Sequence, residues 1–149
     1  MNRRYFLTAA GAAVMAIMAG CGQSESKFVG YWKYPSEAQT DQLPVVLLHI
    51  RLNGDSFFLT FTSWEGPKKG YETKDVAATL GASSNMLNIL GGLRTISYDE
   101  ATDQLLLFVD GEKVAFAQIT KDNYQAALDR GKAEYEREKA KQKETQKAN

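Results

Sequence analysis

The tight-turn signals between short apolar runs constrain the fold of this chain most. Asn53-Gly54, Gly91-Gly92 and Asp110-Gly111 each separate two runs rich in apolar and β-branched residues. Asn, Asp and Gly accept the positive φ that a two-residue hairpin turn requires, so each pair predicts two antiparallel neighbours. Many short runs separated by such turns are typical of an all-β domain.

Eight apolar runs predict an antiparallel meander over residues 28–120. The expected strands are 28–34, 45–52, 55–64, 71–80, 86–90, 93–98, 104–109 and 113–119. Eight such strands leave two exposed edges unless the sheet closes, and closure leaves an interior that holds side chains or one small ligand. We therefore expect an all-β, eight-stranded up-and-down barrel, with a meander sandwich as the alternative, followed by a C-terminal α-helix.

Alternation along the second and third strands predicts the interior face. Val46, Leu48, Ile50 and Leu52 fall on one side of their strand. Because the chain is rich in aromatic residues for its length, we expect much of the interior to be filled. If a ligand is held, the expected lining is Trp32, Val46, Leu48, Ile50, Phe57, Leu59 and Phe61.

The segment Gly30-Tyr31-Trp32 resembles the Gly-x-Trp signature on the first strand of lipocalins. The resemblance implies the same barrel architecture, with Trp32 packed across the closed end. Lipocalins place an Arg near the last strand over this Trp. Here that region offers no Arg, and the nearest candidates are Gln118 and Lys121.

The first twenty residues predict an export signal. Arg3 and Arg4 precede a small or apolar stretch over residues 6–20. As a helix this stretch is about 22 Å long, which is short of the roughly 20 residues that a membrane-spanning helix needs. A charged start, a short apolar run and a small-residue end are typical of a signal peptide over residues 1–20.

The stretch Ile17-Met18-Ala19-Gly20-Cys21 resembles the bacterial lipobox. The resemblance implies lipidation of Cys21 on sulfur and cleavage before it, with residues 21–27 as the lipidated Cys and flexible tether. Gly22, in place of an Asp, favours the outer membrane facing the periplasm. The alternative is a secretory signal or membrane anchor with a chance cysteine.

Arg3-Arg4-Tyr5-Phe6-Leu7 resembles the twin-arginine export motif, in which Arg3, Arg4, Phe6 and Leu7 would be recognised. The resemblance implies folding before export, which suits a domain without an available cysteine pair. An ordinary secretory signal that carries two arginines is the alternative.

Residues 121–149 predict a helix with a charged tail. Asp122 and Gln125 fit a capping box, and Tyr124, Ala127, Leu128 and Tyr135 lie at helical spacing. We expect these turns to dock on the barrel and Leu128 to be buried. From Glu136 on, the chain has no apolar stripe, which indicates a solvated helix; contact of its positive end with anionic lipid or cell wall is the alternative.

The titratable residues give little support for catalysis. His49 is the only histidine, and Cys21 the only cysteine. Asp99, Glu100 and Asp103 lie in one loop, but their spacing fits a solvated turn better than a calcium site. We therefore expect no enzyme activity, no metal and no cofactor.

Charge and motif together predict a membrane-anchored envelope lipoprotein with a non-catalytic binding domain. Without Arg3 and Arg4, the 18 basic residues fall to 16 against 18 acidic ones, so nucleic acid is not an expected partner. The expected partners are the lipid bilayer, through acylated Cys21, and a small hydrophobic ligand or lipid. The alternative is a protein–protein interaction role, as an envelope-complex accessory, an inhibitor or an immunity-type lipoprotein.

Overall fold

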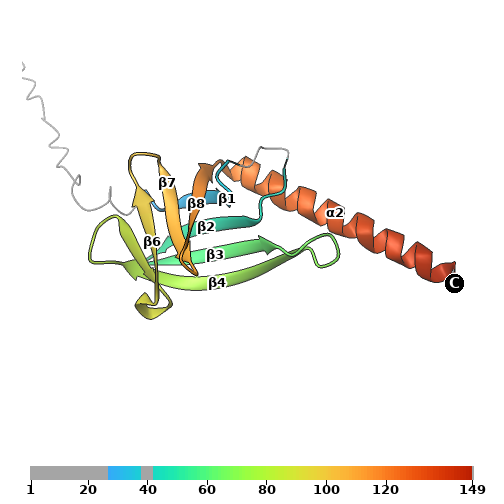
Figure 1. The fold of residues 1–149 in the computed structure, drawn as a ribbon, viewed down its shortest axis with the longest axis horizontal. Helices are drawn as coiled ribbons and strands as arrows, with labels where there is room; N and C mark the ends of the chain where they lie inside the picture. Colours follow the sequence, from blue (N-terminus) through green and yellow to red (C-terminus); the bar gives the residue numbers. More distant parts are fainter. Residues whose placement is uncertain (1–26, 38–41, 149) are drawn as a thin grey trace, which may run out of the picture.

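The chain folds into a closed eight-stranded barrel with one C-terminal helix (Figure 1). This computed structural model describes residues 27–37 and 42–148. The strands are β1 (Gly30–Tyr34), β2 (Val46–Asn53), β3 (Ser56–Trp64), β4 (Tyr71–Leu80), β5 (Met86–Ile89), β6 (Arg94–Asp99), β7 (Gln104–Val109) and β8 (Glu112–Ile119). Each strand pairs antiparallel with the next, and β8 pairs with β1. The predicted barrel is confirmed, and the sandwich alternative is excluded.

The sequence features that predict export and lipidation lie outside the described residues. They are the segment 1–20, with Arg3, Arg4, Phe6 and Leu7, and Cys21. They stay predictions.

One of the three predicted hairpin turns has both the predicted residues and the expected geometry: in the β7–β8 turn, Asp110 and Gly111 have φ values of 52° and 85°. The β2–β3 turn is shifted by one residue, because Asn53 is the last residue of β2 and pairs with Ser56, so the turn is Gly54-Asp55, with a φ of 64° at Gly54. The third connection is longer than predicted, because a 3-10 turn, η1 (Leu90–Gly92), joins β5 to β6. Leu90, Gly91 and Gly92 all have positive φ there.

One end of the barrel interior is tightly packed around Trp32. The Trp32 side chain is fully buried, and its Nε1 donates a hydrogen bond of 3.0 Å to the carbonyl oxygen of Phe28. Phe28 in turn packs edge-on against Phe57 and Tyr98, with ring centroids 6.0 and 6.2 Å apart. Gln118 is the register partner of Trp32 in the β1–β8 ladder, so it lies at the barrel end where lipocalins place an Arg. We call this the packed end.

The alternation of β2 holds for Val46, Leu48, Ile50 and Leu52, since Leu52 is the register partner of buried Phe57 and so lies on the same side of the sheet. Leu48 and Ile50 are fully buried, whereas the Leu52 residue is 48% exposed. Leu52 is more exposed than the other three because it lies next to the last residue of β2, Asn53.

The helix α2 (Lys121–Lys147) has its N-cap two residues earlier than the sequence predicts. Its N-cap is Thr120, whose Oγ1 accepts a hydrogen bond of 3.1 Å from the backbone N–H of Asn123. The predicted Asp122 cap is therefore wrong. β8 ends at Ile119, so Thr120 is the residue that is still extended when the helix starts.

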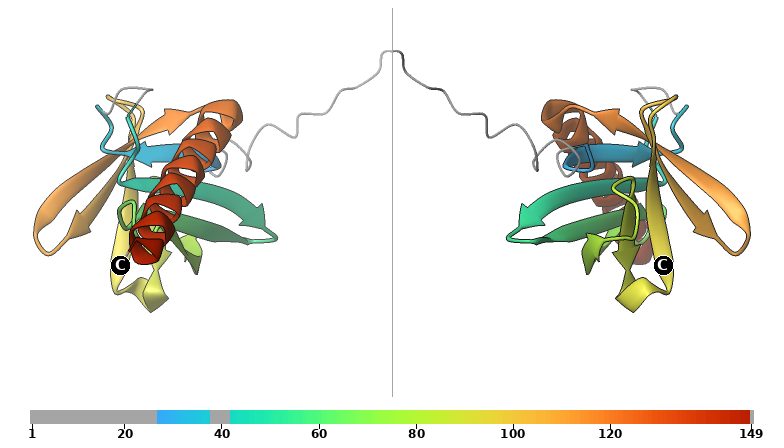
Figure 2. Two further views of the ribbon diagram at one scale, coloured as in Figure 1. Left: turned by 90° about the vertical axis from the view of Figure 1, so that its right-hand side faces the viewer. Right: turned by 90° about the vertical axis from the view of Figure 1, so that its left-hand side faces the viewer.

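The first half of α2 docks on the outside of the barrel, as Figure 2 shows from both sides. Tyr124, Ala127 and Gly131 are its buried residues, and Tyr124 and Ala127 form an apolar cluster with Leu47 of β2. Leu128, expected to be buried, is only half-buried. Docking of the helix is nevertheless as expected.

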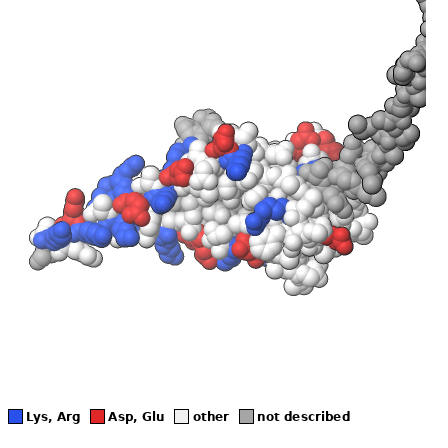
Figure 3. Space-filling view, turned by 180° about the vertical axis from the view of Figure 1, so that it is seen from behind, with Lys and Arg blue, Asp and Glu red and all other residues white. Residues whose placement is uncertain are grey.

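The second half of α2 leaves the barrel. The Tyr135 ring lies against the β3–β4 connection, since a Cβ on Gly70 would be 3.4 Å from it. Residues 139–148 are all exposed, and α2 extends past the β3–β4 connection (Figure 1). Figure 3 shows Lys and Arg side chains gathered along this projecting half.

Candidate functional site

The end of the barrel opposite Trp32 contains an open cavity of about 540 Å³. Its walls are mainly apolar and come from all eight strands, together with Leu90 of η1. The principal wall residues are Val46, Phe61, Val76, Leu107, Val114 and Phe116. We call this end of the barrel the mouth.

Side-chain size explains why one end is filled and the other is open. The inward positions of the packed end carry large side chains, such as Phe28, Trp32 and Phe57. Nearer the mouth, the inward positions of β2, β4 and β8 carry Val46, Val76 and Val114. Small β-branched side chains do not reach across an eight-stranded barrel, whose interior is just wide enough for side chains to fill. The cavity therefore lies where the valines lie.

The residues predicted to line a ligand site divide between the two ends. Phe61 and Val46 line the cavity. The other five, Trp32, Leu48, Ile50, Phe57 and Leu59, belong to the buried core of the packed end and do not line it.

Several wall residues were not predicted, although their strands carry the same signal. Leu105, Leu107 and Val109 alternate along β7, and Val114 and Phe116 along β8. The same period-2 pattern would have placed them inside. Tyr34 also lines the cavity and packs against Phe116, with ring centroids 5.7 Å apart.

Three charged side chains stand at the mouth: Arg94, Asp110 and Glu112. Arg94 is two residues from buried Ile96, and Glu112 is two residues from Val114, so both occupy inward positions at the first residue of their strands. All three are exposed, and within the described residues none of them takes part in an ion pair.

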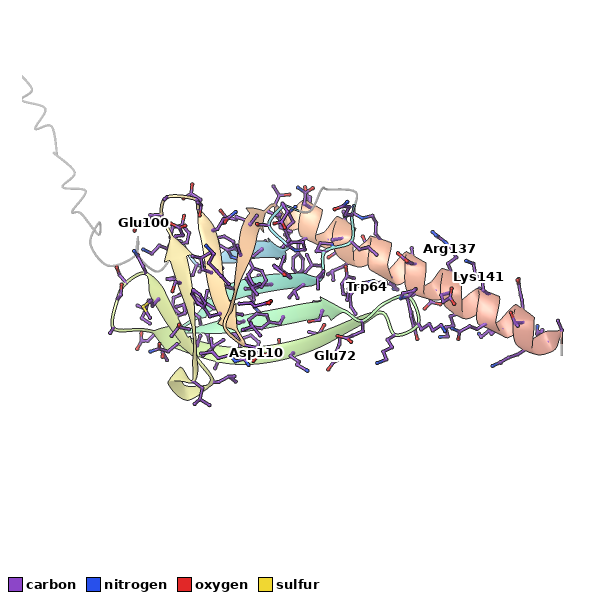
Figure 4. All side chains as sticks on the ribbon, viewed as in Figure 1. Trp64, Glu72, Glu100, Asp110, Arg137 and Lys141 are labelled. Atoms are coloured by element: carbon purple, nitrogen blue, oxygen red, sulfur yellow. The ribbon has the colours of Figure 1, made fainter. Side chains whose placement is uncertain are left out.

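The described chain begins at the packed end, away from the mouth. The Lys27 Nζ donates a hydrogen bond to Asn85 Oδ1 and lies 3.5 Å from a carboxylate oxygen of Glu100. Glu100 follows β6 and Asp110 follows β7, so the two mark opposite ends of β7, as Figure 4 shows. Lys27 and the mouth therefore lie at opposite ends of the barrel.

The Asp99 and Asp103 carboxylates of the loop 99–103 are hydrogen-bonded by neighbouring residues of the chain. The Asp99 carboxylate accepts hydrogen bonds from the Thr102 hydroxyl at 2.8 Å and from the Ala101 amide at 3.0 Å. Both hydrogen bonds lower the pKa of Asp99, and the bond from the Thr102 hydroxyl has the larger effect. The Asp103 carboxylate accepts a hydrogen bond of 2.7 Å from the Tyr98 hydroxyl. In the part of the chain that the structure describes, no group of three or more His, Cys, Asp or Glu residues is placed to hold a metal ion.

His49 lies on the outer face of β2, beneath α2. Its ring stacks on Tyr31 with centroids 4.2 Å apart and lies 6.1 Å from Tyr124 of the helix. Burial, followed by the positive charges of Arg51 and Lys121, lowers the pKa of His49 from its ordinary value of 6.5. The neutral imidazole is thus the form that fits under the helix.

We expect the free energy of unfolding to fall as the pH drops from 7 to 5. The unfolded chain takes up a proton at His49 at a higher pH than the folded chain, so this contribution is complete above the unfolded pKa and is lost below it. Urea unfolding at each pH measures the decline. His49→Phe keeps an aromatic ring on Tyr31, and in this variant the free energy of unfolding should fall less between pH 7 and pH 5. If it falls as much as in the unsubstituted chain, titratable groups other than His49 cause the loss.

Comparisons with protein-family models, curated proteins and solved structures found no match. Among the described helices, none is long and apolar enough to cross a membrane.

Proposed function

We propose that this chain is a membrane-anchored envelope lipoprotein whose barrel binds a small hydrophobic ligand without catalysis. The observation that carries the proposal is the open, apolar-walled cavity of about 540 Å³. Ligand sites are commonly concave, mostly apolar clefts of about 300–1,000 Å³ with a few polar groups. The cavity matches this description in its volume, in its mainly apolar walls and in the few charged residues at its mouth.

The volume supports one alkyl chain rather than two. A cavity of about 540 Å³ has the volume of about 18 water molecules at roughly 30 Å³ each, and a methylene group is of similar size. A dodecyl to hexadecyl chain fits, whereas two such chains do not. Each buried methylene contributes about 0.8 kcal/mol, so one chain supplies substantial affinity.

The charged and polar groups of the cavity support binding rather than catalysis. Of the described residues, those with a polar or charged group that line the cavity are Tyr34, Ser63, Arg94, Asp110 and Glu112, and the described histidine, His49, is not among its lining residues. A serine without a neighbouring base is a weak nucleophile. We propose no cofactor and no metal for this site.

The position of Lys27 gives the proposed anchor a direction. A tether from Cys21 to Lys27 reaches roughly 20 Å when extended, and Lys27 lies at the packed end. Lipidation of Cys21 would therefore hold the packed end toward the bilayer, with the mouth facing away. In the outer membrane, the ligand would enter from the periplasm.

Filling the cavity tests the binding function. In Val114→Trp, the larger side chain would occupy the cavity, so we expect at least a tenfold loss of affinity for the neutral fluorophore N-phenylnaphthylamine with little change in melting temperature. A chain that begins at Gly22 keeps every described residue and suits the titration.

Leu59→Trp is the matched control in the packed end. Leu59 is fully buried, so overfilling there should lower the free energy of unfolding by about 1–3 kcal/mol. Failure of the unsubstituted chain to bind the fluorophore saturably, or equal affinity in Val114→Trp, would refute the carrier role.

Replacing the proposed acylation site tests the anchor. Because lipidation requires the thiol, Cys21→Ser should carry no fatty acid and should leave an uncleaved precursor. Labelling with a clickable fatty acid, followed by mass determination, measures both. Label retained on Cys21→Ser would place the acyl chains elsewhere and remove the lipobox interpretation.

The second candidate is a protein–protein interaction role, and the projecting half of α2 favours it. Arg137 and Lys141 point away from the barrel in Figure 4, and residues 139–148 are exposed. A long charged helix that covers no core of its own is available to a partner. Removal of residues 139–149 should leave ligand binding intact under the carrier proposal.

A further inference from the structure

We propose that the mouth selects a single-chain amphiphile with a zwitterionic head group, one that carries an ammonium and an anionic group together. This inference rests on the proposed ligand-binding function and specifies the ligand's polar end. It starts from the charges at the mouth, Arg94, Asp110 and Glu112, which carry both signs.

The strand register places Arg94 and Glu112 at one level of the barrel. Val109 pairs with Glu112 in the β7–β8 ladder. Continuing the β6–β7 register by two residues from Ile96 and Leu107 places Arg94 level with Val109 on its other side. Adjacent strands are about 4.8 Å apart, so the Arg94 and Glu112 backbones lie about 10 Å apart across β7.

The chain itself does not neutralise these charges. Arg94 forms no ion pair of 4.0 Å or less with Asp110 or Glu112, nor with any other described carboxylate. Inward-facing charges of opposite sign that stay apart leave a gap between them. An amphiphile whose tail fills the apolar cavity places its head group in that gap.

The balance of signs decides among head groups. A carboxylate head gains attraction from Arg94 but meets repulsion from Asp110 and Glu112. An ammonium head is attracted by the two carboxylates and repelled by Arg94. A head group with both charges directs its anionic group to Arg94 and its ammonium group to the carboxylates, so it alone satisfies all three.

The test compares four amphiphiles with one tail and different heads. They are dodecylphosphocholine, dodecanoate, dodecylammonium and the neutral dodecylglycerol, each used below its micelle concentration to displace N-phenylnaphthylamine from the chain that begins at Gly22. Because the charges are exposed, we expect dodecylphosphocholine to bind about threefold to fivefold more tightly than either ion. High salt should reduce this difference.

Two charge-neutralising variants and one control separate the charges. Glu112→Gln should weaken the binding of dodecylphosphocholine and strengthen that of dodecanoate. Arg94→Gln should weaken the binding of both and strengthen that of dodecylammonium. Asp55→Asn removes an exposed carboxylate of the β2–β3 turn that does not line the cavity, and it should change nothing.

The outcomes distinguish this inference from the function beneath it. Equal affinities for all four heads, in the unsubstituted chain and both mouth variants, would overturn head-group selection but leave the hydrophobic cavity in place. Preference for dodecanoate that Arg94→Gln abolishes would overturn it in favour of a fatty-acid site. Displacement of the fluorophore by none of the four would overturn both proposals.

Discussion

Trp32→Ala should lower the free energy of unfolding by about 3–5 kcal/mol, more than any other single substitution considered for this chain. Trp32 is fully buried and is the largest side chain in the packed end. Truncation leaves a cavity beside Phe28 and removes the donor of the 3.0 Å hydrogen bond to the Phe28 carbonyl. Urea unfolding followed by circular dichroism measures the loss.

Trp64→Ala is the matched control because Trp64 is half-buried near the mouth-side end of β3. It packs on Tyr71 with ring centroids 4.9 Å apart, so its truncation should cost clearly less. Equal losses for the two variants would contradict the tighter packing assigned to Trp32.

Gly131→Leu should lower the free energy of unfolding by about 1–3 kcal/mol, although Leu favours helices more than Gly does. A Cβ at position 131 would lie 2.1 Å from Cε2 of Tyr71, closer than two carbon atoms approach. The Tyr71 ring already packs against Trp64 on the barrel side. Either the ring or α2 must move, and thermal melting measures the cost.

Ala133→Leu is the control for the helix surface, since Ala133 is exposed two residues further along α2. It should change the stability by no more than about 0.5 kcal/mol. In a Tyr71→Ala background, the cost of Gly131→Leu should shrink, because the side chain that it meets is gone. If Gly131→Leu lowers the free energy of unfolding as much in that background, the clash with Tyr71 is not the cause of its cost.

The strand order was predictable because turn chemistry and alternation are local signals. Asp110-Gly111 is the turn of its hairpin as predicted, whereas the β2–β3 turn is shifted by one residue to Gly54-Asp55. The four strands were nevertheless predicted within about one residue of their observed ends. Gly91-Gly92 was less informative. Its positive φ values are real, but they extend to Leu90, and a non-glycine residue in that conformation is not expected from sequence.

The position of the cavity was harder to predict than the inward face. Alternation predicts which residues point inward. It does not predict at which height along the barrel the inward side chains are too small to fill the interior. Leu59 and Phe61 are both inward residues of β3, yet Leu59 is in the packed core and Phe61 lines the cavity. The difference depends on Val46, Val76 and Val114, which come from three other strands.

The docking of α2 shows a similar limit. The helical spacing of Tyr124 and Ala127 predicts a buried face, and both are buried. Gly131 is equally buried, but a glycine carries no hydrophobic signal, so only the approach of Tyr71 shows why it matters.

Native mass spectrometry tests the central claim, that the barrel holds a hydrophobic ligand, most directly. The chain that begins at Gly22 would be purified without detergent and then incubated with dodecylphosphocholine. The account predicts a one-to-one complex that survives transfer to the gas phase, and its near absence in Val114→Trp at the same concentrations. If the spectra of both proteins show the mass of the unbound chain alone at every ligand concentration, the claim is contradicted.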